Sequence, residues 1–362
     1  MTASIHTEIC DLLSIRYPII LAGMAGIANM APLVSAVSEA GGLGTLGAAY
    51  LQPEQMRQMI RDIQQRTSAP FAVNLFAHVG PDDLTRFDEV SGELNGIRDS
   101  LGVAHPSEAD IRTSDMFEAQ FAVLLEEKVP IISLTFGLLD ESYTERAKQA
   151  GMTIIATATT VDEAVQAEQS GCDAIVAQGS EAGGHRGTFD TTDRRMGANI
   201  GIMALVPQIV DRVQVPVIAA GGIMDGRGLA ASLMLGAAGV QMGTRFLTSQ
   251  ESGAHSVYKQ ALLKSTEEST VLTDAFSGRP ARGIQNAFIQ AWANSHIAPL
   301  PFPTQNTLTR EIRNAAAREN NAEYMALWAG QGTRLLTADQ DAGEIVEQVA
   351  REALDKLSVE RK

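Results

Sequence analysis

The sequence predicts a (β/α)₈ barrel with a small helical cap inserted after the eighth strand. Apolar runs of strand length alternate with amphipathic segments over the first 246 residues, and eight such runs occur. Alternating strands and helices indicate parallel strands joined by helical crossovers, and eight such units close into a barrel. A doubly wound open sheet is the alternative, but residues 23–26, after the first run, lack its fingerprint of three spaced glycines.

The eight expected strands begin near the N-terminus and continue to residue 246. They are Pro18–Ala22, Gly42–Gly47, Phe71–Leu75, Ile131–Phe136, Thr153–Thr159, Ala174–Gln178, Val217–Gly221 and Val240–Phe246. The amphipathic segments between them predict helices, among them Leu51–Arg66, Asp140–Ala150, Thr160–Ser170, Ile202–Val213 and Gly226–Leu235.

Two connections are longer than barrel closure requires. The first, from Phe76 to Val129, is predicted to contain a loop and two helices, Pro81–Leu101 and Ser107–Lys128. It either covers one edge of the barrel mouth or is a decoration without chemistry. The second, Thr188–Asn199, is polar and rich in Asp, Thr and Gly. That composition fits an active-site flap and fits a merely mobile loop equally well.

The alternation stops near Gln250, which indicates a segment inserted before the last barrel helix. Its expected helices are Ser252–Lys264, Gln285–Ala293 and Arg310–Ala326, and its Pro-rich turn spans Ala298–Pro303. An acidic amphipathic segment, Ala342–Leu357, predicts the eighth barrel helix. The expected organisation is a barrel over residues 1–250, a helical substrate cap over 251–326, and a C-terminal segment with the last barrel helix over 327–362.

Composition and charge exclude several classes of function. The 362-residue chain carries a net charge of −15, so nucleic acid and anionic membranes would repel it. No apolar run reaches the ~18 residues that a membrane helix needs, and the N-terminus shows no signal peptide. The two cysteines, Cys10 and Cys172, have no metal-ligand spacing around them, so no metal site is predicted. We therefore expect a cytoplasmic protein.

Glycine turns follow the last two expected strands, where barrel enzymes bind phosphate groups. Strand seven ends at Gly221-Gly222, and strand eight contains Gln241-Met242-Gly243-Thr244. Free backbone N–H groups at such turns, and the positive end of a following helix, bind phosphate without a lysine. The pair of turns predicts a ligand or cofactor that carries a phosphate.

Side chains at other strand ends suit a flat heterocycle. The backbone at Gly23-Met24-Ala25 can lie against a planar ring, while Asn74 and Gln178 each offer an amide donor and acceptor. Alternating donors and acceptors are what the polar edge of an isoalloxazine ring presents. A purely structural role for each amide is the alternative.

The loop Gln178–Gly187 places four glycines around one histidine, His185. A neutral imidazole near such a ring is suited to removing a proton from carbon close to neutral pH. His78 is a second possible mouth residue, whereas His255 and His296 fall in the expected cap. Cys172 precedes strand six and so lies at the opposite end of the barrel, which argues against a cysteine nucleophile at the mouth.

The chain resembles the nitronate monooxygenases, formerly called 2-nitropropane dioxygenases, a family of flavin-dependent (β/α)₈ enzymes. The motifs that carry the resemblance span nearly the whole chain in order. They are Pro18–Gly26, Ala40–Gly47, Phe71–Leu75, Gln178–Gly187, Val217–Gly228, Val240–Phe246, Ser277–Ile284 (SGRPARGI) and Leu327–Gly332 (LWAGQG).

The resemblance implies a tightly bound FMN, O₂ as oxidant, and alkyl nitronates as substrates that yield a carbonyl compound and nitrite. The family's catalytic base corresponds to His185, which would act on neutral nitroalkanes and would position and balance the charge of an anionic nitronate. Arg186 either assists there or is a solvated loop residue. The family's FMN contacts correspond to Met24, Asn74, Gln178, Gly183, Gly222, Gln241, Met242, Gly243 and Thr244.

Two alternatives accompany this interpretation. The FMN-dependent enoyl-acyl-carrier-protein reductases share the EAGGH and AAGGI motifs, but no docking place for NAD(P)H is recognisable, and SGRPARGI and LWAGQG resemble the nitronate branch more. A non-catalytic flavin-binding protein is the second alternative, against which the intact His185 argues. The expected partners are a small nitronate and O₂, and a homo-oligomer is compatible with the sequence.

Overall fold

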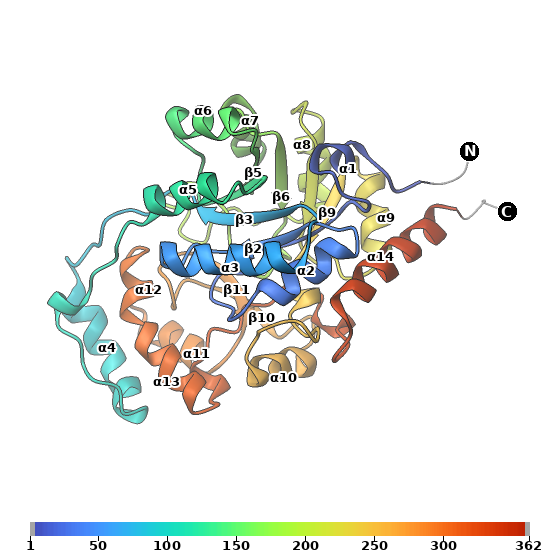
Figure 1. The fold of residues 1–362 in the computed structure, drawn as a ribbon. Coiled ribbons are helices and arrows are strands. Elements are labelled where there is room, and N and C mark those ends of the chain that lie inside the picture. Colours follow the sequence, from blue (N-terminus) through green and yellow to red (C-terminus); the bar gives the residue numbers. More distant parts are fainter. Residues whose placement is uncertain (1–3, 359–362) are drawn as a thin grey trace.

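The computed structural model describes residues 4–358, and its centre is an eight-stranded parallel barrel (Figure 1). The strands follow the order β1-β9-β8-β6-β5-β4-β3-β2 around the sheet. An isolated parallel bridge between Ile20 and Leu43 joins the first strand to the residue before the second strand. This contact closes the sheet on itself, so the predicted (β/α)₈ barrel is confirmed.

Each barrel strand overlaps one predicted apolar run. The strands are β1 Ile19–Leu21, β2 Gly44–Gly47, β3 Phe71–Phe76, β4 Ile131–Thr135, β5 Thr153–Ala158, β6 Ala174–Gln178, β8 Val217–Ala220 and β9 Gly239–Met242. The largest difference is at the last strand, which ends at Met242 because the chain turns at Gly243 into the 3₁₀ helix η2, Thr244–Phe246. That early turn points the residues after β9 toward the barrel mouth.

The helices between the strands form the outer layer. They are α2 Ala31–Glu39, α3 Pro53–Arg66, α5 Phe117–Glu126, α6 Glu141–Gln149, α7 Val161–Gln169, α8 Ile202–Val210, α9 Gly226–Met234 and α14 Ala342–Leu357. Caps from the sequence fix their starts: the side chains of Thr160, Asp225 and Asp341 accept backbone N–H bonds at α7, α9 and α14. Helix α14 packs against α9 and α2, and so completes the ring of helices.

The barrel interior is filled and is closed at its N-terminal end. Inward-facing strand residues such as Ile131, Ile155 and Val176 form one apolar cluster with Ile9 and Leu13 of α1, Glu8–Leu13. Cys10 belongs to this cluster, and Cys172 is buried before β6, at the same end. Neither thiol is near the mouth, and for Cys172 this agrees with the sequence interpretation.

The long connection 76–129 supports the cap. Its helix α4, Phe87–Ser100, shares an apolar cluster with Phe276, Phe288 and Ile312, and Figure 1 shows α4 beside the cap helices. Helix α4 begins six residues later than predicted, because Asp82 and Asp83 are instead bonded to Thr113 and Thr304. The second predicted helix of this connection is also shorter, since α5 begins at Phe117.

The segment after β9 is not purely helical, which corrects one part of the predicted cap. It contains α10 Ser256–Lys264, α11 Ala287–Ser295, α12 Thr304–Leu308 and α13 Arg310–Arg318, but also strands β10 Thr270–Thr273 and β11 Ala281–Ile284. Strand β11 pairs with β7, Gly184–His185, in the loop after β6. Short-range patterns do not reveal this sheet, because the pairing joins residues almost 100 positions apart and β7 has only two residues. In the described part of the chain, no helix is long and apolar enough to span a membrane.

Candidate active site

A cavity of about 510 Å³ lies at the C-terminal ends of the barrel strands, between the barrel and the cap. Volumes of this order are typical of cofactor and substrate sites. All ten residues predicted for the site line it, although they come from five different parts of the chain. They are Met24, Asn74, Gln178, Gly183, His185, Gly222, Gln241, Met242, Gly243 and Thr244.

The two glycine turns present backbone N–H groups without acceptors. Within residues 4–358, the amides of Gly222 and Ile223 after β8, and of Gly243 and Thr244 after β9, pair with no protein oxygen. All four residues line the cavity. Orphaned amides converging on one space are suited to an anion such as a phosphate. The helix end contributes less than predicted, because the Asp225 carboxylate already accepts the Arg227 and Gly228 amides at the start of α9.

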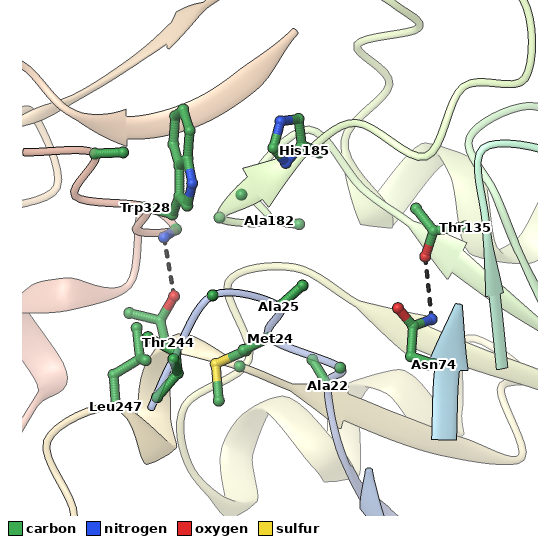
Figure 2. Close-up of a pocket in the computed structure, with 18 of the residues that line it drawn as sticks. Ala22, Met24, Ala25, Asn74, Thr135, Ala182, His185, Thr244, Leu247 and Trp328 are labelled. Carbon is green, nitrogen blue, oxygen red and sulfur yellow. Dashed lines mark hydrogen bonds between the residues drawn. The ribbon is translucent and has the colours of Figure 1, made fainter. Parts of the chain in front are cut away.

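Strand β4 and the turn after β1 hold Asn74, a residue of β3, against the cavity wall. Its Nδ2 donates to the Ser133 carbonyl, to Ser133 Oγ and to Thr135 Oγ1 at 3.1–3.2 Å, so Oδ1 is turned away as an acceptor. A Cβ on Gly23 would lie 2.4 Å from the Asn74 Cβ, so only glycine permits this close approach of the β1 turn. Figure 2 shows the Ala22–Ala25 turn across the cavity from His185 and Trp328.

Gln178 holds the histidine loop in place. Its Nε2 donates to the His185 carbonyl at 3.0 Å, and its Oε1 accepts the Gly187 N–H at 2.8 Å. One amide therefore spans the loop, with a single N–H left for another partner. This supports the structural alternative for Gln178, while its predicted contact with a cofactor ring stays a prediction.

His185 extends from β7 into the cavity between aromatic rings. The ring centroids of Phe136 and Trp328 lie 5.6 and 5.3 Å from that of the imidazole. Burial, and then the positive charges of Arg279 and Arg313, lower the pKa of His185 to about 3. The imidazole is therefore neutral near pH 7, as predicted, and it is a weaker proton acceptor than an ordinary histidine.

Ser277 fixes the orientation of this imidazole. Ser277 Oγ lies 2.8 Å from His185 Nε2, and it also contacts the backbone N–H and carbonyl of Arg279. Nδ1 of His185 has no hydrogen-bond partner in residues 4–358, so it is the nitrogen that is free to exchange a proton with a ligand. The SGRPARGI motif was only a family marker in the sequence, and nothing there indicated that Ser277 contacts His185 across 92 positions.

Arg186 is neither a solvated residue nor a cavity residue, which contradicts both sequence interpretations. Its side chain is completely buried and donates to three backbone carbonyls: Gly179 at 2.7 Å, Gln178 at 2.8 Å and Ala198 at 3.2 Å. Burial lowers the pKa of Arg186 to about 10, so the guanidinium stays charged near neutral pH. Arg186 therefore braces the histidine loop from behind.

Replacing Arg186 with methionine is expected to lower the free energy of unfolding by about 3 kcal/mol or more, because three buried carbonyls would each lose their partner. Urea denaturation measures this value. Arg227→Met is the matched control, since the Arg227 side chain is largely exposed and pairs only with Asp225 on the surface. Its cost is expected to stay below about 1 kcal/mol. Equal effects of the two variants would contradict the bracing role.

The segment Thr188–Asn199 is anchored to the structure around it, although it has no regular secondary structure. Arg195 forms an ion pair with buried Asp274 in the cap at 2.5 Å, and Glu163 accepts the Phe189 N–H at 2.8 Å. None of its residues lines the cavity. The segment thus fastens the loop after β7 to the cap and does not itself contact a ligand in the cavity.

Several lining residues had no signal in the sequence. Tyr50 follows β2, His255 and Tyr258 belong to the start of α10, and Arg313 projects from α13. The His255 Nδ1 accepts the Val257 N–H and so caps α10. His255, Tyr258 and Arg313 become neighbours of the predicted site only because the cap folds back over the barrel mouth.

The LWAGQG motif also belongs to the cavity. Trp328 stands beside His185, and Gly330 donates its N–H to Thr244 Oγ1 at 3.0 Å (Figure 2). A Cβ on Gly183 would lie 2.4 Å from the Gly330 nitrogen, so the two glycines allow the histidine loop and this segment to touch. Both motifs that distinguished the nitronate branch in the sequence therefore contact the histidine loop.

Comparisons with known proteins show the family to which the chain belongs. The family model for nitronate monooxygenase matches residues 6–352. A probable nitronate monooxygenase from Staphylococcus haemolyticus is 43% identical over 358 residues, which cover 98% of this chain and 99% of the relative.

Two solved structures are similar over nearly the whole chain. A nitroalkane oxidase from Streptomyces ansochromogenes has a TM-score of 0.89 and 40% identity, covering 96% of this chain and 98% of that one. FabK from Thermotoga maritima is more distant, with a TM-score of 0.77 and 30% identity, covering 98% of both chains. The family match and the relative of similar length lead to one conclusion: the chain belongs to the nitronate monooxygenase family of flavin-dependent oxidoreductases.

Proposed function

We propose that the protein uses FMN to oxidise alkyl nitronates with O₂, giving a carbonyl compound and nitrite, and that it acts on neutral nitroalkanes more slowly. The observation that carries the proposal is one cavity in which His185 and the two acceptor-free glycine turns face the same space. The turns suit a phosphate, and the imidazole suits a small substrate at the other part of the cavity.

The cavity residues fit FMN in their chemistry. The free amides of Gly222, Ile223, Gly243 and Thr244 would hold the phosphate, and the Asn74 Oδ1 offers an acceptor to a ring N–H. The apolar side chain of Met24 and the Ala22–Ala25 backbone provide a flat wall for the ring. When bound, FMN supplies the electron acceptor for oxidation of the substrate.

His185 handles the substrate proton. With Nε2 bonded to Ser277, its free Nδ1 would accept the proton that a neutral nitroalkane must lose from carbon. A pKa of about 3 makes this transfer unfavourable, because a base works best when its pKa is near the working pH. A nitronate has already lost that proton. The low pKa therefore favours nitronates as the better substrates.

The protein's own walls keep water away from the reacting atoms. Phe136 and Trp328 place apolar rings beside His185, and Phe76 packs behind Phe136 with its ring centroid 4.5 Å away. Such a site strengthens electrostatic contacts and limits competing proton exchange with solvent.

The direct test is steady-state turnover of a nitronate in air with no NAD(P)H. We expect oxygen uptake and nitrite release, with no stimulation when NAD(P)H is added. The alternative, an FMN-dependent enoyl-acyl-carrier-protein reductase, predicts NAD(P)H oxidation with an enoyl thioester and no nitrite from the nitronate. A non-catalytic flavin protein predicts a flavin spectrum and neither reaction.

A further inference from the structure

The cavity has one permanently charged side chain, Arg313 of α13. Among the described residues, no Asp, Glu or Lys lines it, and Arg313 is its single arginine. The chain as a whole carries a net charge of −15, so the cavity presents a positive charge in a protein that is negative overall.

Arg313 has unused hydrogen-bonding capacity. Its Nη2 donates to the carbonyl and to Oδ1 of Asn306, at 2.6 and 3.0 Å. Its Nε is buried and has no partner, and in residues 4–358 the guanidinium forms no ion pair, so Glu311 acts on it only through its charge. A half-buried guanidinium without an ion-pair partner is costly to remove from water unless a ligand supplies the negative charge.

Arg313 belongs to the His185 side of the cavity. Its positive charge reaches both His185 and Tyr50, lowering the pKa of the first and opposing the burial that raises the pKa of the second. The Tyr50 ring contacts Phe76 with centroids 5.3 Å apart. Phe76 in turn contacts Phe136, and Phe136 contacts His185. The other nearby cation, Arg279, lies over the Phe136 ring and does not line the cavity.

We propose that Arg313 is the residue that recognises the negative charge of the substrate, and so makes the enzyme selective for anionic nitronates over neutral nitroalkanes. This inference rests on the proposed function. A neutral His185 cannot balance the charge of a nitronate, which is the role that the family resemblance assigned to it. Arg313 has the required charge, and its unpaired N–H groups suit the two oxygens of a nitro group.

The phosphate of FMN is the competing anion for Arg313. The acceptor-free amides at Gly222 and Gly243 belong to the ends of β8 and β9, whereas the charge of Arg313 acts at His185 and Tyr50. The phosphate thus has a site of its own, and the guanidinium is left for the substrate.

The test uses the flavin-loaded protein and nitrate, a planar anion that resembles the nitro group and is not consumed. Isothermal titration in chloride-free buffer gives its Kd. For Arg313→Met we expect the nitrate Kd to rise about 10- to 100-fold, since a charge-assisted hydrogen bond is lost. Arg313→Lys should recover part of the affinity. Arg318→Met, on the exposed face of the same helix, should leave the nitrate Kd unchanged.

A second variant avoids removing the arginine. Asn306→Asp keeps the shape of the side chain and places a carboxylate 3.0 Å from the Arg313 Nη2. The internal ion pair should occupy the guanidinium, so the nitrate Kd should rise about tenfold or more. This variant keeps the proposal testable if Arg313→Met does not fold.

Kinetics and flavin content separate the outcomes. We expect Arg313→Met to raise the KM for a nitronate by about 10- to 100-fold, with the KM for the neutral nitroalkane and the Kd for FMN unchanged. An unchanged nitrate Kd in both Arg313→Met and Asn306→Asp overturns the inference. A loss of FMN affinity in Arg313→Met also overturns it, because the guanidinium would then bind the phosphate. If nitrate binding depends on Arg313 but no nitronate is oxidised, the anion site stands and the proposed function fails.

Discussion

Replacing His185 with asparagine is expected to lower kcat/KM for a neutral nitroalkane by about 10²- to 10⁴-fold, the usual contribution of a general base. The asparagine can keep a contact with Ser277, but it cannot accept a proton from carbon. For a preformed nitronate, which needs no proton removal, we expect a loss of about tenfold or less. Steady-state kinetics with the two forms of the same compound gives both numbers.

The pH dependence provides the control for this prediction. Since burial lowers the pKa of His185 to about 3, the neutral base is the main form above that pH, and activity on a nitroalkane should show no inflection from His185 between pH 5 and 7. The FMN content of His185→Asn should equal that of the wild type. A loss of less than about twofold on the nitroalkane would show that His185 is not the base.

Replacing Gly222 with alanine is expected to raise the Kd for FMN by about 10- to 100-fold, because the substitution disturbs the amides that would hold the phosphate. Gly222 has a φ of +68°, and a Cβ would lie 3.3 Å from the Cβ of Glu181, tighter than a usual contact. To relieve that contact, the turn at Gly222 must shift, and its amides shift with it. Equilibrium dialysis of the protein with FMN measures the change.

Gly151→Ala is the matched control for the turn. Gly151 has a similar φ of +74°, but its Cβ would meet nothing within 4 Å, and it lies between α6 and β5, away from the cavity lining. Both variants should cost about 1 kcal/mol of stability for the left-handed backbone. A similar change in FMN affinity for both would mean that the Gly222 turn has no special part in cofactor binding.

The barrel and one wall of the site could be predicted from the sequence, because both depend on local patterns. Buried parallel strands are continuous apolar runs, and residues that follow such strands, such as Asn74 and Gly222, must meet at one end of a barrel. For that reason the predicted residues at the strand ends line the same cavity, together with Gly183, which the family resemblance added.

The wall formed by the cap depended on contacts that no local pattern encodes. Ser277 reaches His185 through the pairing of β11 with the two-residue strand β7, and Arg313 enters the cavity only because α13 folds back over the mouth. Arg186 was misjudged for a related reason. A charged residue in a glycine loop usually faces water, but here three carbonyls of the surrounding chain enclose it.

In the proposed reaction a nitronate, and not a nicotinamide, delivers electrons to a flavin in this cavity. Anaerobic mixing of the FMN-loaded protein with a nitronate, followed in the visible flavin absorbance, tests it most directly. We predict that the nitronate alone bleaches the flavin and that air restores the absorbance. A flavin that is bleached by NAD(P)H but is unaffected by the nitronate would contradict the account.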